Sequence, residues 1–409
     1  MTGEELTPLV DQLRWDRRRD PYRGRREYSH TARELADACE RLIGSGRSAS
    51  AVPVLRRAVD RMTSALQYLD DSSGIVGDDL QRLMGLYARA CTSAPPSPKS
   101  LAGWLVKLEF DGPGWPRIML RDFAGALGER GLAELERLVA ERVATADPES
   151  WSGVFAVRDF REQLAEVSGD VDRYVAVLAE YLRSAEQYER IVEALQNADR
   201  REEAVGWARR GLDQHAGSPL ADRLRDLLVE LLLDARENAA AVAARRDEFE
   251  RRPTAAAYRS LAGTVARTDA EHPERWALEV LRERMAVQPA YLSELIEVLL
   301  AVGDTDEAWR VGSVHVEAIG ARQWLRLLEL RRVTHPGEVV EAYQQVIENQ
   351  ILDSRDKHRY RRALPLLAAL RDAWRACGDR TTFPAYLTEL RVRHKRRPTF
   401  LKTLDRAGF

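Results

Sequence analysis

The chain has 409 residues, which is enough for two domains or for one long array of repeats. Hydrophobic residues make up 44% of it and charged residues 31%, a balance typical of a folded, soluble, helix-rich protein. The formal net charge is only −2, so no overall polycation favours nucleic acid, and no apolar run reaches the ~18 residues that span a membrane.

The three cysteines, Cys39, Cys91 and Cys377, lie far apart within helical patterns, so we expect buried free thiols rather than a disulfide framework. Residues 1–19 contain no apolar core of an export signal. Only five of the 63 basic residues are lysines, a bias typical of GC-rich bacterial genomes. We therefore expect a bacterial, cytoplasmic protein.

Residues 1–147 predict an N-terminal helical domain of irregular helix pairs. A short helix over 1–14 is followed by a basic loop over 15–28. Asp78 and Asp79 are expected at the start of their helix, where negative charge is favourable. Further helices are expected over 29–43, 52–69, 78–91, 101–110, 117–127 and 131–146.

Residues 148–409 predict a more regular helical repeat domain. After helices over 155–167 and 170–183, aspartates recur every 35 residues, at Asp199, Asp234, Asp269 and Asp304. A period of about 35 with helix–turn–helix content is typical of a tetratricopeptide-like α-solenoid. The last helices are expected over 322–333, 336–350, 356–376, 380–394 and 398–406.

Each of these aspartates lies between a large apolar helix and a helix with small residues, so we expect it to cap the second helix. Small residues let paired helices approach closely, and Ala204 and Ala239 in particular are expected to be buried. The sequence therefore predicts an all-α fold, an α-solenoid of antiparallel helix pairs, tetratricopeptide-like in its second half. The small residues in the second helices are Ala204, Ala208, Ala239, Ala243, Ala277 and Ala308.

The last quarter of the chain carries a recognisable series of residues: Trp324-x3-Leu328, His335-Pro336, Tyr343, Phe383-x2-Tyr386-Leu387 and Phe400-x3-Leu404. These residues resemble the C-terminal helical region of bacterial, in particular actinobacterial, SWIM zinc-finger proteins. The resemblance implies a helical-repeat module, and a looser likeness extends over most of the chain. The C-x-C…C-x-H zinc site of that family has no counterpart, because the chain has no closely spaced cysteine pair. Its zinc-dependent contacts are therefore not carried over.

No motif predicts catalysis, a metal or a cofactor. The seven histidines never form H-x3-H or H-E-x-x-H, so converging zinc ligands are not expected. Gly74 and Gly77 are misplaced for a calcium loop around the aspartates at 70–79. Gly125-x2-Gly128-x2-Gly131 indicates a helix end and a helix start rather than a phosphate loop, and no G-x-S-x-G elbow is present.

Two arginine-rich segments near the chain ends are candidate polyanion-binding sites, because guanidinium groups suit phosphate contact. A third basic cluster spans 357–362. The alternative is that these arginines solvate a loop and a terminal helix or pair with acids. The candidate polyanion-binding residues are Arg17, Arg18, Arg19, Arg23, Arg25, Arg26, Arg391, Arg393, Lys395, Arg396 and Arg397.

Tryptophans recur near the repeat helices, where packing between helices is their usual role. Some could instead anchor a partner on a concave face. The candidate partner-binding aromatics are Trp207, Trp276, Trp309 and Trp324.

Taken together, these features favour a non-enzymatic helical-repeat scaffold that mediates protein–protein interaction. The alternative is a nucleic-acid-associated accessory protein that binds polyanions through its arginine-rich termini. We expect a protein partner, no membrane and no cofactor; the identity of the partner and the oligomeric state stay open.

Overall fold

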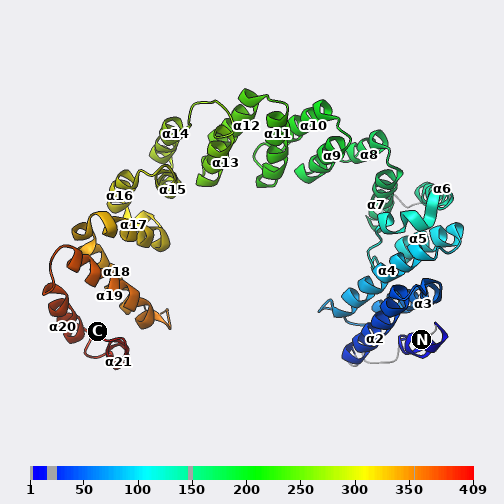
Figure 1. Ribbon diagram of the computed structural model, residues 1–409, viewed down its shortest axis with the longest axis horizontal. Helices are drawn as coiled ribbons and strands as arrows, with labels where there is room; N and C mark the ends of the chain where they lie inside the picture. Colours follow the sequence, from blue (N-terminus) through cyan, green and yellow to red (C-terminus); the bar gives the residue numbers. More distant parts are fainter. Residues whose placement is uncertain (1–2, 16–24, 146–150, 354) are drawn as a thin grey trace. The chain divides into compact units, whose positions relative to one another are not determined.

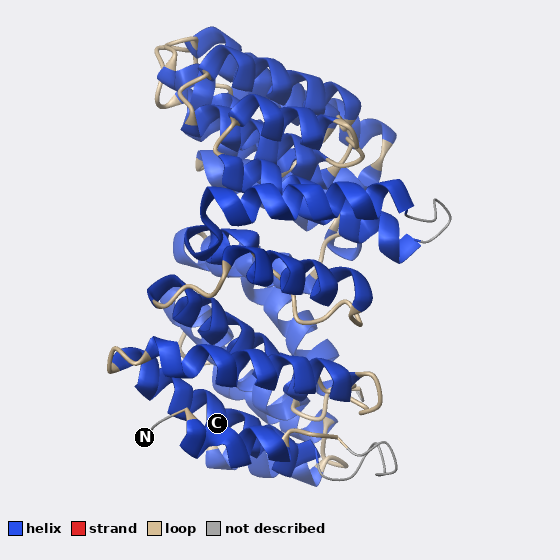
Figure 2. Cartoon of the chain, turned by 90° about the vertical axis from the view of Figure 1, so that its right-hand side faces the viewer, coloured by secondary structure: helices blue, strands red, loops and turns tan. Residues whose placement is uncertain are grey.

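The computed structural model describes residues 3–15, 25–145, 151–353 and 355–409. All regular structure in these ranges is helical, with 21 α-helices, five short 3-10 helices and no strand (Figure 1 and Figure 2). Consecutive helices pack against each other as pairs, so the predicted all-α fold of antiparallel helix pairs is confirmed. No helix in the described ranges is long and apolar enough to cross a membrane.

The chain divides into two compact units, Met1–His215 and Ala216–Phe409, called unit 1 and unit 2 below. The predicted domain boundary between residues 147 and 148 falls within 146–150, outside the described residues. That boundary therefore stays a prediction.

Unit 1 has a main core that runs from Leu6 to Leu164. At its centre the ring of Tyr87 lies 5.0 Å from Trp104 and 5.9 Å from Phe123. Gly128, with a φ of 55°, divides α6 into two helical segments at the predicted break. The helices of unit 1 are η1 (Glu4–Leu6), α1 (Thr7–Gln12), α2 (Arg25–Gly44), α3 (Ser48–Leu66), α4 (Ile75–Ser93), α5 (Pro98–Asp111), α6 (Leu120–Thr145), α7 (Trp151–Ser168), α8 (Val171–Ala179), α9 (Ala185–Asn197) and α10 (Arg201–Gln214).

Unit 2 has a main core that runs from Phe249 to Leu404. The helices of unit 2 are η2 (Pro219–Ala221), α11 (Asp222–Asp234), α12 (Asn238–Arg251), α13 (Ala255–Val265), α14 (Glu274–Val287), η3 (Pro289–Tyr291), α15 (Leu292–Val302), α16 (Thr305–Val314), η4 (Val316–Ala318), α17 (Ala321–Thr334), η5 (Pro336–Val339), α18 (Val340–Leu352), α19 (Arg359–Ala376), α20 (Thr382–Arg393) and α21 (Pro398–Arg406).

Many residues that carry the resemblance to SWIM-associated helical regions are buried in this second core. Their spacing reflects which side chains face neighbouring helices, so the resemblance is largely a packing pattern. The buried members are Trp324, Leu328, Tyr343, Phe383, Tyr386, Phe400 and Leu404.

Within residues 185–320, three turns between paired helices end the first helix with a residue in the left-handed region. These residues are Asp199 with a φ of 59°, Arg236 with 61° and Gly303 with 88°. In each turn the next backbone N–H donates to the carbonyl five residues earlier, which is the Schellman arrangement. The three N–O distances are 2.9 Å from Arg200 to Leu195, 2.8 Å from Glu237 to Leu232 and 2.9 Å from Asp304 to Leu299.

The expectation that four aspartates cap the second helix is wrong for three of them. Asp304 does cap α16, because its carboxylate accepts a hydrogen bond from the Glu307 N–H at 3.0 Å. Asp199 instead occupies the left-handed end of α9, Asp234 is the last residue of α11, and Asp269 lies in the loop before α14. The left-handed residue therefore sets the geometry of each turn. Its position in the sequence relative to the repeating aspartate differs from one turn to the next.

The close-contact alanines follow these turns rather than a strict 35-residue period. In these three turns, a fully buried alanine lies five residues after the left-handed residue. Ala239 and Ala243, which the sequence pattern placed at the contact, are exposed. Ala204, Ala241, Ala277 and Ala308 are fully buried, with spacings of 37, 36 and 31 residues, and Ala208 is fully buried as well.

The start of α4 agrees with the prediction for Asp78, which lies in the first turn, but not for Asp79. Asp71 in the preceding turn accepts a hydrogen bond from the Gly77 N–H at 2.7 Å, so it satisfies the first turn. Asp79 is not at the helix start but is buried inside unit 1. Its carboxylate accepts hydrogen bonds from Ser29 and from Arg33, the latter at 2.8 Å, and thereby joins α4 to α2.

Two of the three thiols are buried as predicted. Burial raises the pKa of Cys39 to about 12 and that of Cys91 to about 11. Cys377 is exposed, which corrects the expectation for that residue, because it follows the last residue of α19 at a helix end.

Replacing Arg236 by glycine is expected to stabilise the chain by about 0.5–1 kcal/mol, because an L side chain is strained in the left-handed region and glycine is not. Urea unfolding measures the change. The control Arg236→Ala removes the same exposed side chain but keeps the strain, so it should not stabilise. Equal stability of the two variants would contradict the left-handed turn.

Replacing Ala204 by leucine is expected to destabilise the chain by about 1–3 kcal/mol, because the added atoms overpack the contact between α9 and α10. The matched control is Ala239→Leu on α12, where the side chain is exposed and little change is expected. Unfolding free energies that fall equally in both variants would refute the corrected register.

Candidate functional site

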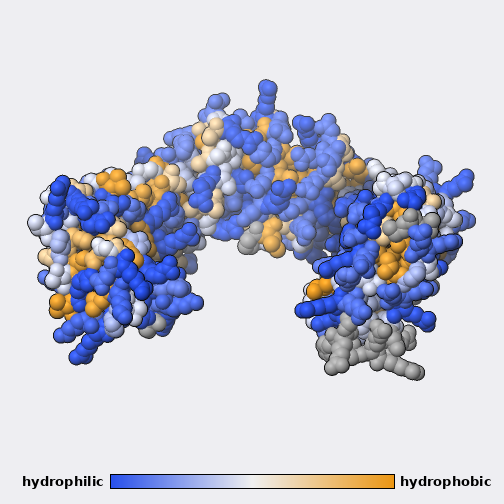
Figure 3. All heavy atoms as spheres, turned by 60° about the horizontal axis from the view of Figure 1, so that its bottom comes forward, coloured by the Kyte–Doolittle hydropathy of each residue, from blue (hydrophilic) through white to orange (hydrophobic). Residues whose placement is uncertain are grey.

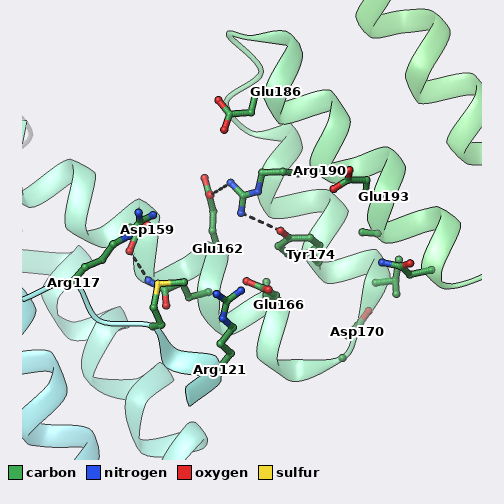
Figure 4. A pocket seen from close by; sticks show the side chains of 17 residues that line it. Arg117, Arg121, Asp159, Glu162, Glu166, Asp170, Tyr174, Glu186, Arg190 and Glu193 are labelled. Carbon is green, nitrogen blue, oxygen red and sulfur yellow. Dashed lines mark hydrogen bonds and ion pairs between the residues drawn. The ribbon is translucent and has the colours of Figure 1, made fainter. Parts of the chain in front are cut away.

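A groove of about 550 Å³ opens on unit 1 between α7, α8 and α9, next to the start of α6 (Figure 4). Asp159, Glu162 and Glu166 project into it from one face of α7, because residues three, four and seven apart share a helix face. Glu186 and Arg190 reach it from α9 in the same way. Side chains from consecutive helices therefore form a polar lining.

The floor of the groove is an ion-pair network around one buried carboxylate, that of Glu162. Glu162 is only 7% exposed, and its carboxylate accepts from Arg158 Nε at 2.8 Å and from Arg190 Nη1 at 2.7 Å. Arg190 Nη2 also donates to the Tyr174 hydroxyl at 3.0 Å. Burial raises the pKa of the Tyr174 phenol. Because removing one partner would leave a buried charge uncompensated, this network fixes the relative position of α7, α8 and α9.

Gln163 connects the groove to the start of α6. Its side-chain oxygen accepts from the Leu120 N–H at 2.7 Å, and its amide nitrogen donates to the Ile118 carbonyl at 3.1 Å and to Asp159 at 2.5 Å. The amide thus satisfies backbone groups at a helix start where no intrahelical partner exists. These hydrogen bonds join α7 to the start of α6 on one side of the groove.

The groove carries a negative potential. Six carboxylates line it, from Asp159, Glu162, Glu166, Asp170, Glu186 and Glu193, against three guanidinium groups, from Arg117, Arg121 and Arg190. Nearby on α5, burial and then the charge of Asp159 raise the pKa of Glu109 to about 7, although Arg117 opposes the shift. Such a lining attracts cationic groups and repels anions.

The lining does not resemble a reaction centre. Among the described residues, no group of three or more histidine, cysteine, aspartate or glutamate side chains is arranged to hold a metal ion. The buried carboxylate of Glu162 is fully engaged by arginines, and the exposed carboxylates of Glu166 and Glu186 face open solvent. The arrangement is suited to binding by charge and hydrogen bonds.

The predicted polyanion-binding residues near the N-terminus fall largely outside the described residues, namely Arg17, Arg18, Arg19 and Arg23. Arg25 donates to the Asp70 carbonyl at 2.9 Å and faces its carboxylate, whereas Arg26 is exposed.

The C-terminal set lies in unit 2 and is partly engaged. Arg391 donates to Asp405 at 2.6 Å, and Arg393 lies 3.6 Å from Glu348. Arg397 donates to the Ile351 carbonyl at 3.3 Å. Lys395 and Arg396 are exposed.

The four candidate tryptophans each pack against a ring or a guanidinium group of the chain itself. Trp309 stacks on Trp324 with ring centroids 5.3 Å apart. Trp207 in unit 1 is covered by Arg210, whose guanidinium carbon lies 4.3 Å from the ring centroid. Trp276 packs on Phe249 at 5.5 Å. Their role as partner anchors stays a prediction.

The groove itself escaped the sequence analysis. Its signal is present, because polar residues recur at helical spacing on both α7 and α9. In the sequence, a polar helix face cannot be distinguished from ordinary solvated surface. The structure shows that the polar faces of α7 and α9 line the same groove together with α8.

No protein-family model matches the chain, and no curated protein sequence matches it. Solved structures give weak likenesses. Yeast Tom70 aligns at 12% identity over 98% of this chain and 99% of its own, with a TM-score of 0.25. A circular tandem repeat protein aligns at 15% identity over 100% and 99%, with a TM-score of 0.20. The Cut9–Hcn1 hetero-tetramer of the APC/C aligns at 11% over 95% and 94%, with a TM-score of 0.22. At these scores the likenesses bear on neither activity nor partner.

Glu109 should make unit 1 less stable as pH rises. Its pKa in the folded chain is raised from 4.5 to about 7, so the folded state binds the proton more tightly and loses that advantage between pH 4.5 and 7. The free energy of unfolding of Glu109→Gln, relative to that of the native chain, is expected to rise by about 1–3 kcal/mol between pH 4.5 and 8. The partial exposure of Glu109 keeps this difference below the full value of the pKa shift.

Urea unfolding of both proteins across this pH range measures that difference. The control Glu129→Gln changes an exposed carboxylate on α6 and should show no such trend. A pH-independent difference between Glu109→Gln and the native chain would contradict the raised pKa.

Proposed function

We propose that this chain is a non-enzymatic helical-repeat scaffold and that the groove of unit 1 binds an extended, lysine- or arginine-rich segment of a protein partner. The observation that carries the proposal is the groove lined by twice as many carboxylates as guanidinium groups. Helical repeats commonly present extended grooves of this kind to partner chains.

The groove combines fixed and accessible charges. The Glu162–Arg190–Tyr174 network is centred on the buried Glu162 carboxylate and links α7, α8 and α9, so the groove needs little rearrangement on binding. Glu166 and Glu186 are exposed at its surface, where they can contact a cationic side chain. Contacts of this type accelerate association and select against acidic segments, and they weaken with salt.

Panning a randomised peptide library against the full chain tests the proposal. We expect the native chain to enrich peptides rich in lysine and arginine. Reversing two exposed charges, with Glu166→Lys and Glu186→Lys together, should abolish that enrichment and should remove the same proteins from pull-downs out of the native host.

The matched control is Glu129→Lys with Glu202→Lys, which changes the net charge equally at exposed positions away from the groove. This control should retain both the peptides and the captured proteins. Absence of enrichment by the native chain, or equal losses in the two double variants, would rule out the groove as the binding site.

The kinship to SWIM-associated helical regions and a bacterial, cytoplasmic setting remain part of this proposal. Support comes from the residues of the second core that carry the resemblance. A gene for a SWIM zinc module beside the gene for this chain would support the kinship, and its consistent absence from the neighbourhood would count against it.

A further inference from the structure

Two basic segments of unit 2, far apart in the sequence, meet at one corner. Segments 357–362 and 393–397 together hold eight lysines and arginines and no aspartate or glutamate. The first leads into α19, and the second joins α20 to α21 (Figure 1). The ring centroids of Tyr360 and Phe400 lie 5.3 Å apart. The starts of α19 and α21 are therefore in contact.

Two guanidinium groups converge at this contact. Arg359 Nη2 lies 3.3 Å from the Tyr360 hydroxyl. Burial tends to raise the pKa of Tyr360, but hydrogen bonds from Arg397 and Arg359 outweigh it and lower that pKa. Two cations on one phenol repel each other unless an anion lies between them.

Neither guanidinium pairs with a carboxylate in the described part of the chain. Arg359 Nη1 donates to the backbone carbonyl of Asp353 at 3.2 Å, and Arg397 Nη1 donates to that of Ile351 at 3.3 Å. Arg359 Nε is buried and has no hydrogen-bond partner. Carbonyl oxygens therefore hold both guanidinium groups, and their positive charges lack a carboxylate counter-ion.

The nearby carboxylates are already engaged. Asp356 accepts from the His358 N–H at 2.7 Å and from Gln350 at 3.0 Å. Glu348 lies 2.9 Å from the buried ring of His394. Asp356 also lies 3.5 Å from Arg362, and Glu348 lies 3.6 Å from Arg393, so these two carboxylates offset two of the eight cations. Among the described residues, no carboxylate pairs with four of the remaining cations, Arg359, Lys395, Arg396 and Arg397.

The helix ends add to the positive potential. Neither α19 nor α21 has an acidic residue in its first turn or a capping hydrogen bond from its N-cap side chain. The N-terminal end of a helix carries partial positive charge, so arginines there are unfavourable and an anion is stabilised. Two such ends meet here beside four cationic side chains, which we call the basic corner: Arg359, Lys395, Arg396 and Arg397.

We propose that the basic corner binds the phosphate groups of a nucleic-acid backbone. Arg359 and Arg397 hold one phosphate between them, and the exposed Lys395 and Arg396 contact neighbouring phosphates of the same strand. A small anion would use only the two central guanidinium groups, whereas the adjoining exposed cations match a chain of phosphates. Contacts of this kind position a strand without reading its sequence. This site lies in unit 2 and is independent of the groove proposed for a protein partner.

Fluorescence anisotropy of a labelled oligothymidylate of about 20 nucleotides, titrated with the full chain, tests the proposal. We expect binding at about 50 mM NaCl that weakens steeply towards 200 mM, because each neutralised phosphate adds about 0.7 to the slope of log K against log salt for a single strand. Lys395→Ala with Arg396→Ala should weaken binding at least fivefold and reduce that slope by roughly 1.4, for two lost contacts.

Both substituted side chains are exposed, so the variant should fold, and an unchanged circular dichroism melt checks this. The matched control is Lys402→Ala with Arg406→Ala, which removes two exposed cations further along α21 and should change affinity less than twofold. Similar losses in the two double variants would overturn the proposal, because they would indicate general charge rather than a site.

Failure of the native chain to bind the oligonucleotide at about 50 mM NaCl would also overturn it. A labelled phosphothreonine peptide is titrated in the same way as a second probe of the basic corner. If that peptide binds and the oligonucleotide does not, the basic corner recognises a phosphoprotein and the nucleic-acid proposal is wrong.

Discussion

The close approach of paired helices at a buried alanine is the constraint on which the repeat region depends. Ala204 in unit 1 and Ala308 in unit 2 are fully buried at such contacts. A left-handed residue lies five positions before each of them, so the turn sets which face of the second helix meets the first. Large side chains then fill the remaining space, as Tyr188 and Trp207 do around the first contact. Packing density leaves little tolerance for a larger residue at the alanine.

Much of the fold could be predicted from the sequence, because helical periodicity and breaking residues are local signals. The break at Gly128 and the last helices of unit 2 lie where the pattern placed them. The exact repeat register could not be predicted. An aspartate at a helix end and an aspartate at a helix start look alike in sequence, and Asp199 and Asp304 take these two different roles. The groove was missed for a different reason: a polar helix face reveals its function only when its neighbour is known.

The charges of this chain also show why composition is a poor guide to binding. Three arginines that look alike in the sequence lie in three different environments. Arg190 is paired with a buried carboxylate, Arg210 covers an indole ring, and Arg359 lies beside another guanidinium with one donor unsatisfied. The last has no carboxylate partner among the described residues, so its charge is available to an outside ligand. The hydropathy view is consistent with a charged exterior, because hydrophilic side chains dominate the face that it shows and hydrophobic ones reach it in patches (Figure 3).

The cysteine arrangement has a practical consequence. Cys39 and Cys91 are buried in unit 1 and burial raises the pKa of both thiols, while Cys377 is exposed at the end of α19. Thiolate is the reactive form, so a maleimide dye should attach to the native chain at Cys377 without any residue being replaced. The label would report from unit 2, and the two protected thiols would become reactive only when unit 1 opens. One reagent can therefore distinguish events in the two halves of the molecule.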